Sequence, residues 1–177
     1  MAGIKEMIGS RVLKSRLKSF KRETLVHNFK TAKSVVLLFD AKIANAFPVI
    51  KEFQSFLKEE GVHCVVFGYI DQKEIPQEML FWKDVHVITR KDLNWYMQPV
   101  GETVELFFRE NPDILIDFTT DQLLEIQFLV QLSPARFKIG SYTEKKNDYD
   151  LMINLSGQND MAFLSQQIRH YVSILNQ

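Results

Sequence analysis

The 177-residue sequence has few of the residues that build disulfides and metal sites. Its single cysteine, Cys64, excludes a disulfide within the chain, and the surrounding run VHCVVFGYI predicts a small buried hydrophobic side chain rather than a nucleophile. The four histidines are scattered from His27 to His170, and none has a second ligand at the spacing of a metal site. We therefore expect no bound metal.

Glycine is also scarce, with seven residues in the chain. Neither the dinucleotide-binding pattern G-x-G-x-x-G nor the phosphate-binding pattern G-x-x-x-x-G-K-[ST] occurs, and the segment FDAKIAN after the first apolar run contains no glycine. The patterns G-x-S-x-G and C-x-x-C do not occur either. The sequence therefore predicts no cofactor and none of the common hydrolase or redox chemistries.

Positive and negative charges are balanced in the sequence. With 22 basic and 22 acidic residues, the chain has no overall field that attracts nucleic acid, so we do not expect a nucleic-acid partner. No apolar stretch approaches the roughly 18 residues that span a bilayer, and MAGIKEMIGS at the start lacks the apolar core of a signal peptide. These absences predict a cytoplasmic protein.

What the sequence does contain is an alternation of strand-like and helix-like segments. The strand-like runs cover residues 34–39, 62–70, 85–89, 113–118, 135–142 and 150–155. Because most of these runs are apolar throughout, they are typical of parallel strands buried on both faces. Segments with helical spacing lie at residues 45–61, 101–111, 121–132 and 160–175. We predict a three-layer, Rossmann-like α/β fold: a mostly parallel sheet of about six strands with helices on both faces.

Residues 1–30 are predicted to form a basic amphipathic helix and a linker, followed by a single domain over residues 31–177. Five basic residues fall on one arc of the helix: Arg11, Lys14, Lys18, Lys21 and Arg22. The helix either packs on the domain with a solvated basic face or binds an anionic surface, such as the inner face of a membrane. Trp95 and Tyr96 are further candidates for a contact surface with a partner.

Two of the apolar runs repeat one pattern, since DILIDFT at 113–119 returns, residue type for residue type, as DLMINLS at 150–156. In the doubly wound strand order 3-2-1-4-5-6 the fifth strand separates the two copies, so we expect the repeat to be mainly structural. Asp117 of the first copy then lies beside Asp40, at the point where the strand order reverses.

Ligands of an open parallel sheet bind at the carboxyl ends of its strands. The candidate ligand-binding residues there are Asp40, Asp117, Thr119, Thr120, Asn154 and Ser156. Asp40 and Asp117 are the pair we expect for acid–base work, since neighbouring carboxylates raise each other's pKa. The same residue types also cap helices and turns, which is the structural alternative.

From Asn111 to Leu155 the sequence resembles the amino-terminal domain of heptosyltransferase-type glycosyltransferases. The resemblance is carried by the strand DILIDF, by ARFKIG at 135–140, which matches A-R-x-x-I-G, and by Tyr149-Asp150 before the next strand. It implies a Rossmann-like fold. The acid-bearing, glycine-containing loop of that family has no counterpart in FDAKIAN, and 177 residues leave no room for its donor-binding second domain, so we expect no glycosyl transfer.

The whole chain also resembles an uncharacterised family of small bacterial proteins, a domain of unknown function, in which VVLLFDAK, DLNWYMQP and DILIDF occur in similar order. That resemblance implies no activity. We expect a non-catalytic Rossmann-like domain that binds a protein partner or a small ligand. Two alternatives stay open: a small enzyme or remnant transferase that uses the strand ends, and an accessory of envelope biogenesis docked on the membrane through residues 1–22.

Overall fold

The computed structural model of the chain describes residues 2–43, 45–121, 123–157 and 160–175. Six parallel strands form one sheet in the order β3-β2-β1-β4-β5-β6, so the predicted fold class and strand order are confirmed. The strands are β1 (Ser34–Asp40), β2 (His63–Ile70), β3 (Val85–Thr89), β4 (Ile114–Asp117), β5 (Phe137–Ser141) and β6 (Leu151–Ile153).

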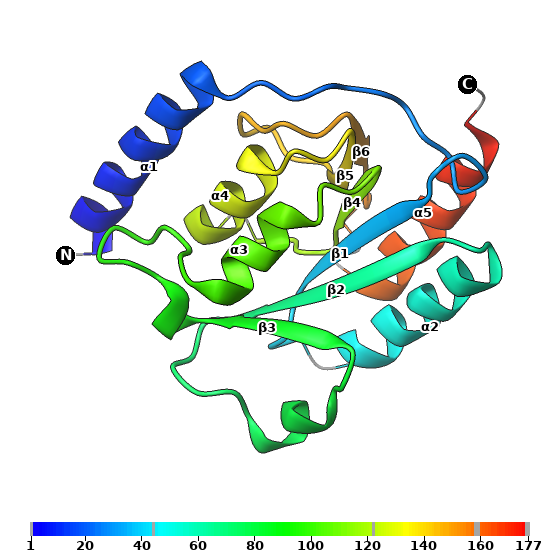
Figure 1. Ribbon diagram of the computed structural model, residues 1–177, viewed down its shortest axis with the longest axis horizontal. Coiled ribbons are helices and arrows are strands. Elements are labelled where there is room, and N and C mark those ends of the chain that lie inside the picture. The colour runs from blue at the N-terminus through cyan, green and yellow to red at the C-terminus, as the bar shows by residue number, and fades with distance from the viewer. Residues whose placement is uncertain (1, 44, 122, 158–159, 176–177) are drawn as a thin grey trace.

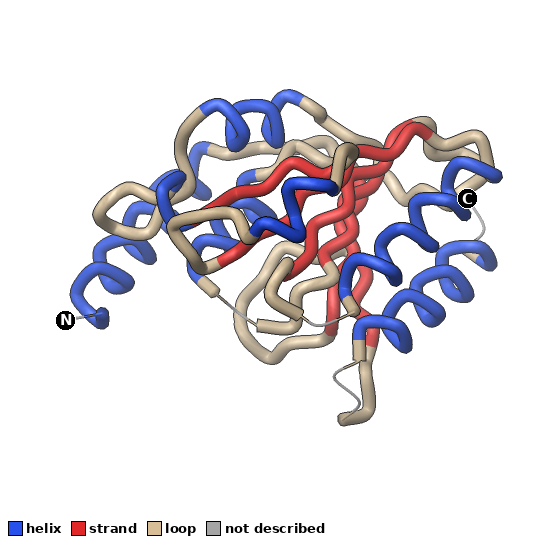
Figure 2. The backbone as a smooth tube through the Cα atoms, turned by 90° about the horizontal axis from the view of Figure 1, so that it is seen from below, coloured by secondary structure: helices blue, strands red, loops and turns tan. Residues whose placement is uncertain are grey.

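Helices cover both faces of the sheet, and Figure 2 shows the strands between the two helical layers. The helices are α1 (Ala2–Ser19), α2 (Ala46–Glu59), α3 (Glu102–Arg109), α4 (Leu124–Leu132) and α5 (Met161–Ile174), with the short 3₁₀ helices η1 (Gln77–Phe81) and η2 (Arg90–Asp92). Val35 and Leu37 of β1 pack with α2 and α5 on one face. Val36 and Leu38 pack with α3 and α4 on the other, because successive strand residues point to opposite sides.

The helix α2 shows how local sequence sets an element. Ile50, Phe53 and Leu57 recur at helical spacing and are fully buried against the sheet. Gly61 has a φ of 76°, the left-handed conformation that ends helices. Asn45, just before the helix, is left-handed with a φ of 63°, and its side chain makes no cap hydrogen bond.

The starts of α4 and α5 differ from each other. Thr119 and Thr120 do not cap α4, which begins at Leu124 without a side-chain cap. The Asp160 side chain does cap α5, since it accepts a hydrogen bond from the Ala162 N–H at 3.0 Å.

The basic N-terminal segment packs on the rest of the protein. The helix α1 ends at Ser19 rather than at Arg22, and it lies against α4 with Leu13 buried between them. Residues 20–33 then cross the amino-terminal edge of the sheet as an extended strap (Figure 1). The Leu25 N–H donates to the Arg136 carbonyl at 3.1 Å, beside the start of β5.

Arg22 anchors this strap and corrects one prediction. Its guanidinium donates to Asp148 at 3.1 Å and to Asp150 at 2.7 Å, and it also bonds the carbonyls of Ala135 and Arg136. The side chain is only 9% exposed. Arg22 therefore belongs to neither the helix nor the exposed basic face, because it ties the strap to the residues just before β5 and β6.

The repeated pattern has a physical meaning at its first residue. Asp113, just before β4, accepts hydrogen bonds from the N–H groups of Lys33 at 2.7 Å and Ser34 at 3.2 Å, at the start of β1. Asp150, just before β6, accepts from the Lys138 N–H of β5 at 2.8 Å. In both copies the leading aspartate therefore fixes the backbone of the neighbouring strand.

Replacing Asp113 by Ala is expected to lower the free energy of unfolding by about 2 kcal/mol, because the exposed N–H of Lys33 and the partly buried N–H of Ser34 lose a charged acceptor. Asp113→Asn keeps an oxygen in the same place and should cost less than half as much. Urea denaturation of both variants measures the difference. Equal losses for Ala and Asn would show that these amide contacts do not stabilise the strap.

Candidate functional site

The carboxyl ends of β4 and β5 hold a buried polar cluster around Asp117. The Asp117 carboxylate accepts hydrogen bonds from the Tyr149 hydroxyl at 2.6 Å and from the Thr119 N–H at 2.8 Å. Burial raises the pKa of Asp117 to about 6, although both partners favour the charged form. The Thr119 hydroxyl also lies near the Asp117 carboxylate and favours its charged form. Among the described residues, this hydroxyl makes no hydrogen bond of good geometry. Asp117 has no exposed surface, so no ligand reaches it directly.

Tyr149 reaches Asp117 because Gly140 leaves room for its ring. A Cβ atom at position 140 would lie 2.5 Å from a ring carbon of Tyr149. The sequence patterns ARFKIG and Tyr149-Asp150 thus describe one packing contact. A second buried pair, in which the Tyr69 hydroxyl donates to Glu125 at 2.6 Å, lies on the same face of the sheet. The sequence did not predict that either tyrosine bonds a carboxylate, since the partners are far away in the chain.

The end of β1 does not share a site with Asp117. Asp117 is in register with Leu38, and Asp40 lies two residues further on, where its carboxylate accepts from the Lys42 N–H at 2.8 Å. Burial raises the pKa of Asp40, and the carboxylates of Asp121 and Asp71 add to that rise. The expected mutual effect of Asp40 and Asp117 is therefore not what perturbs either group.

The other three candidates line one small hollow at the ends of β5 and β6. Thr120, Asn154 and Ser156 border a space of about 160 Å³. The Asn154 side chain accepts from the Ser156 N–H at 2.9 Å, the same two-residue turn that Asp117 and Asp40 make. The side chains of Asn154, Asp117 and Asp40 therefore close turns at strand ends.

A larger hollow of about 500 Å³ lies where β1 and β2 end. Its wall includes Trp82, which stacks on Phe47 with ring centroids 4.0 Å apart and planes parallel within 1°. Lys42 is the one charged side chain among the described residues that line it. Trp82 therefore has a packing role, through its stack on Phe47.

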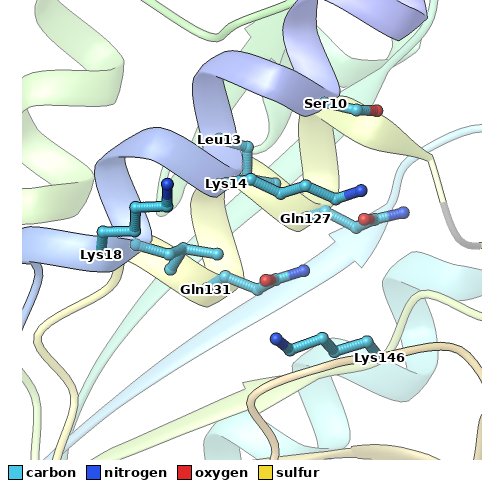
Figure 3. Close-up of a pocket in the computed structure, with 8 residues that line it drawn as sticks. Ser10, Leu13, Lys14, Lys18, Gln127, Gln131 and Lys146 are labelled. Carbon is cyan, nitrogen blue, oxygen red and sulfur yellow. The ribbon is translucent and has the colours of Figure 1, made fainter.

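A cleft of about 450 Å³ between α1 and α4 gathers charge of one sign (Figure 3). Lys14 and Lys18 project from α1, Lys146 faces them from the loop before β6, and the amides of Gln127 and Gln131 lie between them. The described lining is completed by Ser10, Leu13 and Leu17, so it holds no acidic residue. Within the described part of the chain, none of the three amines makes a salt bridge.

A buried lysine lies behind this cleft. The Lys138 side chain of β5 is fully buried, and its amine donates to the Gln131 carbonyl at 3.2 Å and to Asp148 at 2.6 Å. Burial lowers the pKa of Lys138 to about 8, against the pull of Asp148. Gln131 therefore lines the cleft and also binds Lys138, which shares the acceptor Asp148 with Arg22.

The predicted surface-contact residues divide into two groups. Arg11, Lys14 and Lys18 are exposed on α1, and Lys21 is exposed beyond its end. Trp95 is 62% exposed, whereas Tyr96 is partly buried and donates its hydroxyl to Gln98 at 3.1 Å.

Three further kinds of site were considered from the sequence: a reactive cysteine, a metal site and a membrane-spanning helix. Burial raises the pKa of Cys64 to about 12, so its thiol stays protonated. Across the part of the chain that the structure describes, no three His, Cys, Asp or Glu side chains meet as metal ligands. No helix of that part is both long and apolar enough to cross a bilayer.

The Asp117 cluster predicts a pH-dependent stability. Folding raises the pKa of Asp117 from an ordinary 3.8 to about 6, so its contribution is fully present below pH 4 and is lost as pH rises through 6. Asp117→Asn removes this titration. The stability of the variant relative to the natural protein should therefore increase by about 3 kcal/mol between pH 4 and pH 7, at about 1.4 kcal/mol per pKa unit.

Urea denaturation across this pH range measures the difference. Tyr149→Phe serves as the second arm, because losing a donor to the carboxylate should extend the change to higher pH. A stability difference between Asp117→Asn and the natural protein that is constant with pH would contradict the assignment.

Comparisons with other proteins place the chain in a family without assigning an activity. No curated protein matches it. One family model, described as a family of unknown function (DUF6913), matches residues 5–175. The matched stretch runs from α1 to the end of α5, so the cleft between α1 and α4 lies entirely within it. The chain belongs to this family of unknown function, DUF6913.

Proposed function

We propose that the protein is a non-catalytic Rossmann-like domain that binds an anionic small ligand in the cleft between α1 and α4. The observation that carries this proposal is the convergence of Lys14, Lys18 and Lys146 on one concave space whose described lining has no acidic residue. Amines that repel one another in this way favour an anion between them.

The cleft also has the size and mixed chemistry of a ligand site. Its volume of about 450 Å³ falls in the range of small-molecule pockets. Leu13 and Leu17 supply an apolar wall, while the amides of Gln127 and Gln131 carry both donors and acceptors. A compact molecule with two or more phosphate or carboxylate groups fits this arrangement best.

The strand ends support the non-catalytic part of the proposal. Asp117 is enclosed and bonded to Tyr149 and Thr119, and Asp40 and Asn154 each accept a backbone N–H two residues on. A general acid or base must reach its substrate, and Asp117 has no exposed surface. The resemblance to heptosyltransferase-type domains concerns the fold alone. We propose no glycosyl transfer. We also propose a cytoplasmic location, at the inner face of the membrane.

Calorimetric titration with inorganic pyrophosphate, and with citrate as the carboxylate counterpart, tests the cleft. Lys146→Gln and Lys14→Gln should each weaken binding by about tenfold, because each removes a charge-assisted hydrogen bond. Added salt should weaken binding further. Lys83→Gln, an exposed lysine beside β3, is the matched control and should leave binding unchanged.

Thermal melting of each variant checks that the fold is intact. The proposal fails if neither anion binds, or if Lys83→Gln weakens binding as much as Lys146→Gln does.

A further inference from the structure

An apolar groove lies beside the N-terminal end of α1 and shares no described lining residue with the lysine cleft. It encloses about 780 Å³ between α1 and the loop 93–99, and its lining includes Ile4, Leu93, Trp95 and Met97. Trp95 is 62% exposed and Ile4 is 60% exposed, and Met7, one turn further along α1, is 45% exposed. These side chains form a contiguous apolar area on the surface. An exposed area of this kind is typical of an interaction site.

The loop that carries Trp95 is held in one shape. The Asn94 side chain accepts hydrogen bonds from the N–H groups of Tyr96 at 3.2 Å and Gln98 at 3.1 Å. Leu93 and Pro99 form an antiparallel bridge at its base. The exposed indole is therefore presented by an ordered loop.

The loop and α1 form one surface through Gly9. A Cβ atom at position 9 would lie 2.2 Å from the Tyr96 carbonyl oxygen and 2.7 Å from the Leu124 side chain. Only a glycine lets the helix approach the loop this closely. Figure 1 shows the loop beside the N-terminal half of α1.

A basic side chain continues this surface along α1. Residues 4, 7 and 11 follow one another at steps of three or four and share one exposed face of the helix. The apolar pair Ile4 and Met7 is therefore followed by Arg11. Glu6, the single acid of α1, is set seven residues before buried Leu13 and so faces the opposite side.

We propose that this surface, formed by Ile4, Lys5, Met7, Arg11 and Trp95, docks the protein on an anionic lipid bilayer. The proposal goes beyond the small-ligand cleft and stands on other residues. An indole beside aliphatic side chains suits the headgroup level of a bilayer, and Lys5 and Arg11 complement its negative charge. Arg90 also lines the groove, but Asp71 holds its guanidinium at 2.7 Å and 2.8 Å.

The charge favours lipid over an apolar protein partner. A second copy of the chain would bring the same cations together face to face, which is unfavourable, whereas anionic headgroups neutralise them. Arg11 extends the face of Ile4 and Met7, and Glu6 lies off that face, as an anionic bilayer requires.

Fluorescence of the full chain with phosphatidylcholine vesicles, prepared with and without phosphatidylglycerol, tests the docking. Trp82→Phe is used as the background, because it leaves Trp95 as the only tryptophan and keeps the aromatic stack on Phe47. Trp95 emission should shift to shorter wavelength with the anionic vesicles and not with phosphatidylcholine alone.

Co-sedimentation with the same vesicles then assigns the residues. Trp95→Ser should weaken binding about tenfold, and Lys5→Gln and Arg11→Gln should each weaken it about fivefold. Phe81→Ser is the matched control, because Phe81 is 80% exposed on η1, away from α1, and should bind normally. Lys146→Gln should bind vesicles normally, so the cleft and the docking surface fail or succeed separately.

Three results would overturn the docking proposal. They are no sedimentation with the anionic vesicles, equal losses for Phe81→Ser and Trp95→Ser, and a concentration-dependent dimer in ultracentrifugation that Trp95→Ser abolishes.

Discussion

The rest of the structure depends on side-chain oxygens that bind backbone N–H groups at the two edges of the sheet. At the amino-terminal edge, Asp113 holds the start of β1 and Asp150 holds β5, and Arg22 ties the strap to that same edge. At the carboxyl edge, Asp117 and Asn154 each close a turn onto the N–H two residues on. A parallel strand cannot satisfy its end groups by a hairpin, so these acceptors supply what the ladder leaves open.

This constraint moves the candidate ligand site away from the usual place. Ligands of open α/β sheets bind at the carboxyl ends of the strands, through free polar groups and glycine-rich loops. Here Asp40, Asp117 and Asn154 bind neighbouring N–H groups, and the Tyr149 ring fills the space beside Gly140. Uncommitted charge instead lies along α1, which presents Lys14 and Lys18 to the cleft beside α4. The helix that stands outside the α/β alternation is thus the element that carries both proposed contacts.

The fold could be predicted because its signals are local. Unbroken apolar runs identified the six strands, and the known preference for one doubly wound order gave their arrangement. The site could not, because its contacts join distant parts of the chain. Arg22 was assigned to the helix by spacing, yet it binds Asp148, 126 residues away. Lys146 lies in a polar stretch that reads as an ordinary exposed turn, and only the packing of α1 on α4 shows what it faces.

The strand-end N–H groups are already bonded to side chains, and we propose that anions bind beside α1 instead. Amide chemical-shift mapping by NMR during titration with pyrophosphate tests it most directly. We expect chemical-shift changes in α1, α4 and residues 143–148. The N–H signals of Lys42, Thr119 and Ser156 should not move, because Asp40, Asp117 and Asn154 already bind them. Shifts at those three strand-end amides, without any along α1, would contradict it.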